Sequence, residues 1–409
     1  MTELKKASDP FAALRYKDYR RFVSAKFFLT VALQMQAVIM SWFIYEKTKD
    51  PLSLGLIGLV EAVPALSIAL FGGHLADRLS RKKLMIWSTL LTFLASVFLV
   101  LVVKDLFHNQ VTLVYVTIFL IGLARGFHAP TQAAFWPQLV PKEKYVNAST
   151  WNSSLWQVGA VAGPAVGGFA YAWFGAFYSS IAVCTFIIVT LVLYTFMQDR
   201  HVVYKNANES IGESLSKGVK FVFSNQLIIS AITLDLFAVL FGGAVALLPI
   251  FADEILKTGP QGLGILRAAP AVGAVVMALF LAYFPPHKDA GKKMLLSVAG
   301  FGLCMIGFAL SKNFWLSCFL LFVSGALDNI SVVIRATIIQ TFTPDEMRGR
   351  VSAVNSIFVG SSNELGAFES GLAAKLLGLV PSVVLGGCAT MLVVGITALK
   401  AKGLRGLRL

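Results

Sequence analysis

One short polar stretch is the most informative part of this sequence: Gly72-Gly73-His74-Leu75-Ala76-Asp77-Arg78-Leu79-Ser80-Arg81-Lys82-Lys83. An apolar run over residues 54–71 precedes it, and a second apolar run over residues 84–103 follows it. Each run is long enough to cross the ~30 Å hydrocarbon core of a bilayer as a helix. A tight turn that carries four cations between two such runs predicts a loop held on one side of a membrane.

The composition is that of a membrane protein. The chain has 409 residues, of which 57% are hydrophobic and only 14% are charged, and its mean hydropathy is +0.74. Soluble domains carry about 25% charged residues. Apolar runs of membrane-spanning length recur along the whole chain. We therefore expect an all-α integral membrane fold.

Twelve segments can be placed as transmembrane helices. The expected spans are residues 19–45, 53–78, 83–104, 110–139, 146–173, 176–198, 226–252, 262–284, 292–311, 314–342, 350–376 and 380–401. The longest connection is more polar than the rest and divides the spans into six and six. We therefore expect an N-terminal six-helix bundle (1–198), a cytoplasmic linker (199–225) and a C-terminal six-helix bundle (226–409).

Lysine and arginine are distributed unevenly between the two sides of this arrangement. With the N-terminus inside, 25 of the 35 cations fall in cytoplasmic segments. The five in external loops are Lys47, Lys49, Lys104, Lys257 and Lys312. Because cytoplasmic loops are enriched in Lys and Arg, we expect both termini in the cytoplasm. The same placement accounts for the net charge of +14 without a nucleic-acid partner.

The two halves of the chain repeat one another at an offset of 203 residues. Equivalent pairs at this offset are Pro141 and Pro344, Gly122 and Gly325, and Asn152 and Asn355. A similar repeat relates the spans near the opening stretch, where Glu61 aligns with Arg267. Such a repeat predicts two halves of the same architecture.

The opening stretch resembles a signature of the major facilitator superfamily of transporters, G-x-L-a-D-r-x-G-r-k between helices 2 and 3. The matching residues are Gly73, Leu75, Ala76, Asp77, Arg78, Arg81 and Lys82, whereas Ser80 stands where the family usually has glycine. The resemblance implies two pseudo-symmetric six-helix bundles with a substrate site between them near mid-membrane. We expect a conformational motif that bonds neighbouring helix ends, made of Gly73, Asp77, Arg78, Arg81 and Lys82.

Within the superfamily, the chain is most similar to the drug and siderophore exporter branch, which includes an enterobactin exporter and transmembrane secretion effectors. The supporting segments are Gly163-Pro164, Ala246-Leu247-Leu248-Pro249, Gly264-Ile265-Leu266-Arg267-Ala268-Ala269-Pro270 and Asn363-Glu364-Leu365-Gly366. The resemblance implies export of a small amphipathic organic molecule by alternating access with proton antiport. It also implies a monomer in the bacterial inner membrane, with the substrate, protons and the bilayer as partners and no cofactor or metal.

The fifth span carries a glycine-rich motif made of Gly159, Gly163, Pro164, Gly167 and Gly168. Small residues four apart let helix backbones approach closely, and proline bends a helix. The spacing resembles the helix 5 motif of drug–proton antiporters, which is associated with export. Plain helix packing is the alternative, because such spacing is frequent in membrane helices.

Polar residues inside the spans are the candidate functional residues, because each costs about 2.5–3.5 kcal/mol on insertion scales. They should therefore face a cavity or a partner. The candidates for the substrate cavity are Gln34, Gln36, Arg125, Asn152, Gln157, Arg267, Asn329 and Asn363. A carboxyl group in a partly dry cavity can take up and release a proton near neutral pH. The candidates for proton coupling are Asp235, Glu364, Glu61 and Asp328.

The repeat suggests how these charges pair. Glu61 aligns with Arg267, and Arg125 aligns with Asp328, so opposite charges at pseudo-symmetric positions could pair across the cavity. Local neutralisation of each charge by a nearby polar side chain or backbone carbonyl is the alternative. Asp235 and Glu364 are favoured as proton carriers, because neither has a clear opposite charge at its repeat position.

Other function classes find less support. The sequence has no Ser/His/Asp set in plausible order, no metal-ligand cluster and no phosphate-binding loop, so an enzyme is not expected. Three hypotheses remain: a proton-coupled exporter of drugs or siderophores, a transporter of lipids or lysophospholipids, and a non-transporting membrane sensor. A sensor should carry a soluble regulatory domain, and the only segment with soluble character is the short central linker.

Overall fold

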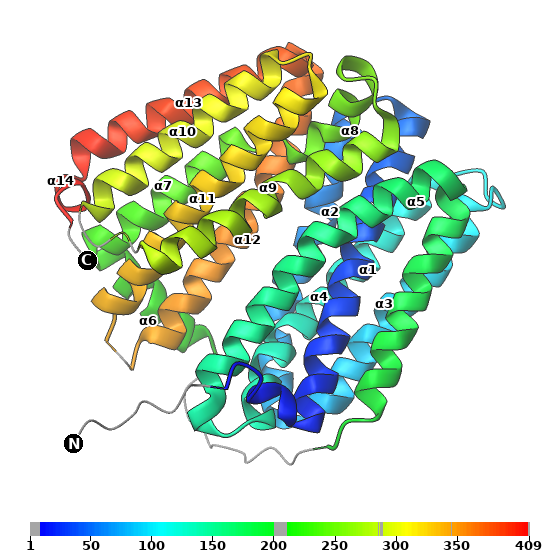
Figure 1. Cartoon of the computed structure of the whole chain (residues 1–409), viewed down its shortest axis with the longest axis horizontal. Coiled ribbons are helices and arrows are strands. Elements are labelled where there is room, and N and C mark those ends of the chain that lie inside the picture. Colours follow the sequence, from blue (N-terminus) through cyan, green and yellow to red (C-terminus); the bar gives the residue numbers. More distant parts are fainter. Residues whose placement is uncertain (1–8, 200–210, 285, 287–288, 345, 408–409) are drawn as a thin grey trace.

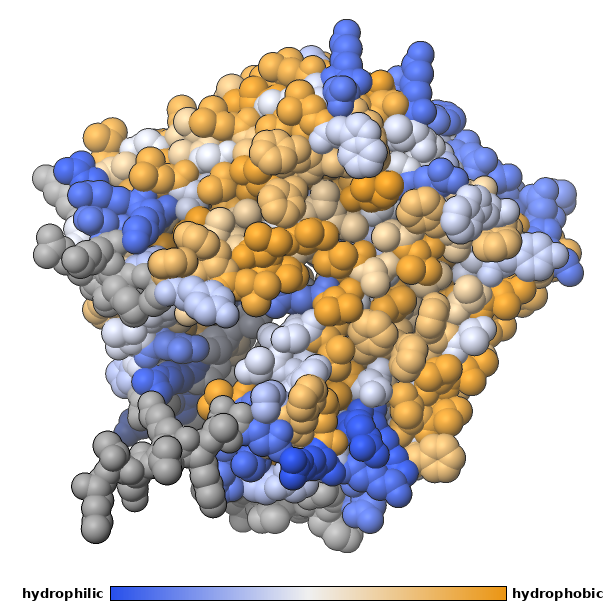
Figure 2. Space-filling view, in the orientation of Figure 1, coloured by the Kyte–Doolittle hydropathy of each residue, from blue (hydrophilic) through white to orange (hydrophobic). Residues whose placement is uncertain are grey.

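The computed structural model describes residues 9–199, 211–284, 286, 289–344 and 346–407, without the side chains of residues 69–78, 211–215 and 402. All regular structure in these residues is helical. Within this described part of the chain, ten helical segments are long and apolar enough to cross a membrane. In Figure 2, apolar residues cover the middle of the visible face and hydrophilic residues gather toward its two ends. These features confirm the expected all-α membrane fold.

The first half forms one helical bundle (Figure 1). Its helices are α1 (Lys17–Thr48), α2 (Pro51–Arg78), α3 (Arg81–Val103), α4 (Gln110–Phe135) and α5 (Tyr145–Thr195). Helix α1 packs along α5, and α4 packs against α2 and α3. Helix α5 bends at Gly175, whose φ of 71° interrupts the helix. Its two limbs correspond to the two expected spans 146–173 and 176–198.

The second half forms the other bundle. Its long helices are α7 (Gln226–Gly242), α9 (Gly259–Tyr283), α10 (Ala290–Leu310), α11 (Phe314–Phe342), α12 (Arg348–Leu377) and α13 (Leu379–Lys400). Helix α7 packs on α12 and α13, and α11 packs on α9 and α10. The expected span 226–252 is broken, because Gly243 adopts an extended conformation after α7. The chain continues as short turns, η4 (Val245–Leu247), α8 (Leu248–Ile250) and the π-helix η5 (Phe251–Ile255).

The expected count of twelve spans remains a prediction. It is reached by counting the two limbs of α5 separately and by including α12, which is long but less apolar than the ten segments. Helix α6 (Ile211–Ser224), in the expected linker, packs against α12 and α7. We propose that the domain limits are residues 1–198 and 226–409, with 199–225 between them.

The two bundles meet along two seams, α2 against α12 and α5 against α9. Figure 1 shows the bundles converging near α8 and lying apart near α6. The described chain begins at Asp9 and ends at Leu407 on the side where they lie apart, which we call the terminal end; the other is the opposite end. Both seams are tightest toward the opposite end, where Gly55 contacts Gly371 and Gly168 contacts Gly264 backbone to backbone.

Candidate functional site: a charged cavity between the two bundles

A cavity of about 440 Å³ lies between the bundles. Helices α1, α2, α4 and α5 line it from the first half, and η4, α9 and α12 line it from the second half. The lining mixes apolar side chains such as Leu33, Met40 and Ile121 with amides and charged groups. The cavity therefore suits a molecule with both apolar and polar surface.

Four charged side chains meet in this cavity. Arg125 on α4 donates a hydrogen bond to Glu61 on α2 at 2.6 Å, and its Nη1 lies 3.6 Å from the carboxylate of Glu364 on α12. Arg267 on α9 interacts electrostatically with both carboxylates and lies 3.3 Å from the Ser41 hydroxyl. Two carboxylates and two guanidinium groups thus form one neutral cluster that joins the two bundles.

The cluster stays accessible to solvent. The Arg125 side chain is 56% exposed although it lies in the middle of α4, and Glu364 is 22% exposed. Helix α1 presents one polar stripe to the same space, with Thr30, Gln34 and Ser41 recurring at helical spacing. The polar side chains of α1 can therefore form hydrogen bonds with a molecule in the cavity, while the charged cluster joins the two halves.

The structure brings together part of the predicted set. The predicted residues that line the cavity are Gln34, Gln36, Glu61, Arg125, Arg267, Asn363 and Glu364. The other predicted polar residues lie elsewhere. Asn152 accepts a hydrogen bond from Lys26 at 2.8 Å, and Gln157 lines a separate groove. The side-chain oxygen of Asn329 is buried without a hydrogen-bond partner among the described residues.

The charge pairing follows the one suggested by the repeat only in part, because Arg267 interacts electrostatically with Glu61 of the other half but Arg125 does not pair with Asp328. Arg125 pairs with Glu61 of its own half rather than with Asp328, which has no ion-pair partner among the described residues. Asp235 on α7 pairs with Arg335 on α11, and both are only 5% exposed. Asp235 and Glu364 were favoured as proton carriers because neither has a clear opposite charge at its repeat position, yet each has an arginine within ion-pair distance, Arg335 for Asp235 and Arg125 for Glu364. Equivalent positions in a repeat need not be neighbours in space.

The basic turn after α2 is bonded to other helix ends of the first half. Arg81 donates to the Ala134 carbonyl near the end of α4 at 2.8 Å. Lys82 donates to the carbonyls of Thr195 and Met197 at the end of α5, at 2.8 and 2.5 Å. These bonds satisfy carbonyls that a helix end leaves without partners. The side chains of the other predicted motif residues, at positions 73, 77 and 78, lie outside the described part of the chain.

The glycine motif of α5 lies where this helix crosses two neighbours. A Cβ at Gly163 would come within 2.5 Å of the Gln34 side chain, and Gly159 and Gly167 face α1 in the same way. A Cβ at Gly168 would come within 2.5 Å of the Pro260 carbonyl, and the Pro164 carbonyl lies against Gly264 of α9. The motif therefore packs α5 closely against both α1 and the other half of the molecule.

A second set of polar contacts between the halves lies at the opposite end. The Tyr45 hydroxyl lies 2.9 Å from Asp253 and 3.0 Å from Glu254, and Lys49 lies 2.7 Å from Asp253. Across the other seam, Lys375 lies 3.3 Å from Asp50.

Asp50 precedes α2 and lies outside the spans. Partial burial acts to raise its pKa, but hydrogen bonds from Ser53 and Lys375 outweigh burial and leave the pKa below its ordinary value of 3.8. The contacts of Tyr45, Lys49 and Lys375 with the other half close the opposite end.

Sequence reasoning missed several residues of the cavity and its closure. Thr30 and Ser41 could have been found, because they lie on the same helical face as the predicted Gln34. Trp156 faces the cavity beside the predicted Gln157, but its aromatic character alone gave no signal. The contacts of Tyr45 and Lys49 with the second half join residues about 200 positions apart, and no local pattern marks them.

Comparisons with known proteins agree with this architecture. The sequence profile of the transmembrane secretion effector family matches residues 8–405. Macrolide efflux protein A of Streptococcus pyogenes is 25% identical over 373 residues, covering 86% of this chain and 87% of that protein. The enterobactin exporter EntS of Escherichia coli is 26% identical over 387 residues, covering 93% and 91%.

Solved structures share the fold at low sequence identity. A peptide transporter of the POT family in complex with sulfate superposes with a TM-score of 0.75 at 12% identity, covering 98% of this chain and 100% of that one. A bacterial homologue of the human lysosomal transporter Spinster, in an inward-facing and unoccupied conformation, gives a TM-score of 0.71 at 13% identity, covering 95% and 96%.

Proposed function

We propose, because the chain belongs to the transmembrane secretion effector family of the major facilitator superfamily, that it exports a small amphipathic organic molecule. The family consists of membrane transporters rather than enzymes. One observation carries the proposal: a cavity of mixed polarity lies on the seam between the bundles and contains charges from both. Relatives named for macrolide efflux and enterobactin export support the direction and the substrate class.

Transport by alternating access would follow from rocking of the two bundles. The described conformation is closed at the opposite end by contacts of Tyr45, Lys49 and Lys375 with residues of the other half. The excess of Lys and Arg on the terminal side supports an orientation with both termini in the cytoplasm of a bacterial cell. In that orientation the structure would be the inward-open state, and export would require the opposite end to open. Arg81 and Lys82, with Asp77 and Arg78, would favour one of the two states.

Proton antiport would use the charged cluster. Protonation of Glu364 removes its attraction to Arg125 and so weakens the one cavity ion pair that links the two halves among the described residues. Glu61 keeps Arg125 in place within the first half. A proton on Glu364 and a substrate in the cavity would then favour different states, which is the requirement for coupled exchange. Asp328 and Asp235 remain weaker candidates.

The test is transport in proteoliposomes with an imposed pH gradient. The substrate panel contains erythromycin, enterobactin and a lysophospholipid, because lipid transport is the competing hypothesis. The chain offers a matched control: Glu369 lies on the same helix as Glu364 but is not among the cavity-lining residues. We expect Glu364→Gln to abolish proton-driven accumulation but keep downhill exchange, and Glu369→Gln to keep both.

Two results would count against the proposal. Full proton-driven accumulation in Glu364→Gln would remove the assigned coupling site. Absence of accumulation of the first two compounds by the wild-type protein, with accumulation of the lysophospholipid, would replace drug or siderophore export by lipid transport.

A further inference from the structure

A second and larger opening lies between α5 and α9 toward the terminal end. Its volume is about 760 Å³, and α5 supplies most of its lining. The residues that line it are Trp136, Tyr145, Val146, Ser149, Thr150, Ser153, Ser154, Gln157, Val158, Val275, Ala278 and Leu279. We call it the α5/α9 groove. None of these residues is charged, in contrast to the central cavity.

The groove exists because the two helices cross at one point and then diverge. They touch backbone to backbone at Gly168 and Gly264. Gln157 and Val275 each lie roughly 11 residues, or about 16 Å of helix, from this crossing toward the terminal end. The tight crossing closes one end of the groove, and the divergence opens it toward the terminal end.

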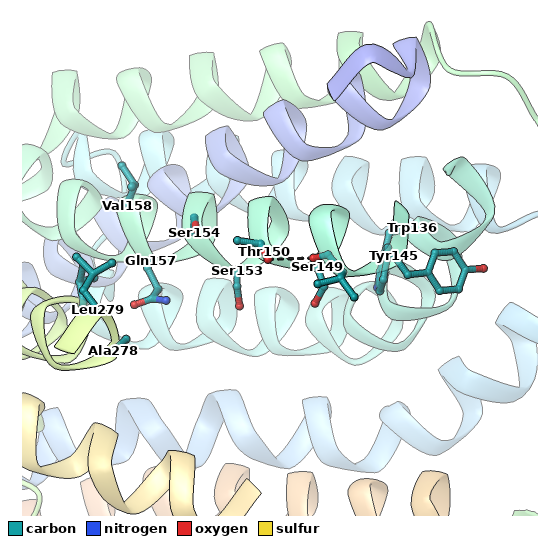
Figure 3. A pocket seen from close by; sticks show the side chains of 12 residues that line it. Trp136, Tyr145, Ser149, Thr150, Ser153, Ser154, Gln157, Val158, Ala278 and Leu279 are labelled. Atoms are coloured by element: carbon teal, nitrogen blue, oxygen red, sulfur yellow. Dashed lines mark hydrogen bonds between the residues drawn. The ribbon is translucent and has the colours of Figure 1, made fainter. Parts of the chain in front are cut away.

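The two walls of the groove differ in chemistry. Figure 3 shows Ser149, Ser153 and Gln157 projecting from the same side of α5. Among the described residues these three side chains have no hydrogen-bond partner, although hydroxyls in helices commonly bond the carbonyl four residues earlier, as Thr150 does at 2.9 Å. The facing wall on α9 is apolar, with Ala278 and Leu279.

One end of the groove lies beside an aromatic pair, and the other end lies beside the central cavity. Near the terminal end, Trp136 and Tyr145 pack edge to face at 5.6 Å, and such aromatic rings favour the membrane–water interface. At the deep end, Gln157 lines the groove while its neighbour Trp156 lines the central cavity. Neighbouring residues of α5 therefore line the two spaces, so the deep end of the groove lies beside the central cavity.

We infer that the α5/α9 groove is an entry site that binds an uncharged, oxygen-bearing amphipathic molecule before it reaches the central cavity. The hydroxyls and the amide on α5 would bond its oxygens, and α9 would cover its apolar face. A neutral solute can enter a groove with an uncharged lining because it needs no counter-ion. A charged solute would lose its hydration there, and no charged side chain of the groove would compensate for that loss. The inference rests on the proposed export function, because it assigns the groove to the same substrate.

The experiment measures protection of a cysteine in the groove. Ser153→Cys is made with the four native cysteines changed to alanine, and its alkylation by N-ethylmaleimide is followed in nanodiscs. Ile181→Cys is the control, because Ile181 is 40% exposed on the second limb of α5, outside the groove. The probe is erythronolide B, a neutral polyhydroxylated macrolactone. Its comparison compound is erythromycin A, which carries a cationic amine.

At ten times its dissociation constant, a bound probe leaves about one site in eleven free, so alkylation of Ser153→Cys should slow about ten-fold. Erythronolide B should protect at lower concentration than erythromycin A, and Ile181→Cys should be unaffected. Adding Ser149→Ala and Gln157→Leu should weaken protection. An unchanged rate at Ser153→Cys, or equal slowing at both positions, would overturn the inference.

Transport measured with the same variants in proteoliposomes separates the two proposals. Transport without protection refutes the entry site and leaves export intact. Protection without any transport refutes export and leaves a binding groove. Protection that persists in Glu61→Gln supports the groove as a site separate from the charged cluster.

Discussion

Two carboxylate–guanidinium pairs in this protein have the same chemistry but differ in solvent exposure and in their place in the fold. Glu61 and Arg125 meet in an open cavity, where their side chains are 24% and 56% exposed, and Arg125 also approaches Glu364 of the other half. Asp235 and Arg335 meet inside the second half, where each side chain is 6% exposed. The first pair can change partners when water, a proton or a substrate arrives. The second pair is sealed and has no such freedom.

This difference in solvent exposure indicates which of the two ion pairs has a functional role. Burying a charge is costly, so a sealed pair is held together because neither partner can be left alone. A pair exposed to solvent gains little net stability from its attraction. We therefore assign conformational coupling to the cavity pair and a structural role to the sealed pair. The predictions below separate these two roles, beginning with the largest expected effect.

Breaking the sealed pair should have the largest effect. Asp235→Asn leaves Arg335 as an uncompensated buried charge, and such losses typically cost about 3–5 kcal/mol of stability. We expect a clear drop in thermal unfolding temperature in detergent and low yield of folded protein. The double variant Asp235→Asn with Arg335→Met removes both charges and should recover much of the loss. A stable single variant with lost proton coupling would instead make Asp235 the proton carrier.

Breaking the cavity pair should have a large effect on transport and a small one on stability. Glu61→Gln frees Arg125 to approach Glu364, so the link between the halves should strengthen and the exchange between states should slow. We expect transport to fall about ten-fold or more, equivalent to about 1.4 kcal/mol on the barrier. The unfolding temperature should change little. Equal losses of stability in Glu61→Gln and Asp235→Asn would remove the distinction between the two sites.

The sequence alone predicted the positions of the helices better than the partners of the charged side chains. Segment limits followed from hydropathy and length, because a bilayer fixes both. The break near Gly175 and the cavity positions of Gln34, Glu61 and Glu364 also followed from pattern. A polar residue within an apolar span must face away from lipid, and the sequence around that residue is enough to identify it.

Partners could not be predicted in the same way. Whether Arg125 meets Glu61 or Asp328 depends on how α2, α4 and α11 rotate about their axes, which packing decides. The pairing of Asp235 with Arg335 needs the contact between α7 and α11, and the repeat carries no information about it. The α5/α9 groove depends on the angle between two helices that are distant in sequence. These features require the folded structure.

A smaller effect is expected at the opposite end, where the Tyr45 hydroxyl lies within hydrogen-bond distance of both Asp253 and Glu254. Tyr45→Phe keeps the ring and removes the hydroxyl, whose single proton bonds one of these carboxylates at a time, a bond worth about 0.5–1.5 kcal/mol. The population should shift toward the state that opens this end, while stability stays almost unchanged. Spin-label distances between the ends of α1 and η5 measure the shift. An unchanged distance distribution would show that this hydroxyl does not hold the end closed.

The smallest effect concerns pH and the contact between Asp50 and Lys375, which lie 3.3 Å apart. Because the folded-state pKa of Asp50 is below its ordinary value of 3.8, the stabilisation from this contact is present above that value and is lost only as pH falls through the folded-state pKa. Between pH 7 and pH 5 the contact should therefore not change, and a carboxyl-carbon NMR titration should show Asp50 ionised throughout. Lys375→Gln should move the pKa of Asp50 back toward its ordinary value and leave the pH dependence of transport near neutrality intact. That pH dependence would then belong to the open cavity site. If Lys375→Gln altered it, protons would instead act at the closed end, and the comparison between the two ion-paired sites would no longer locate the coupling.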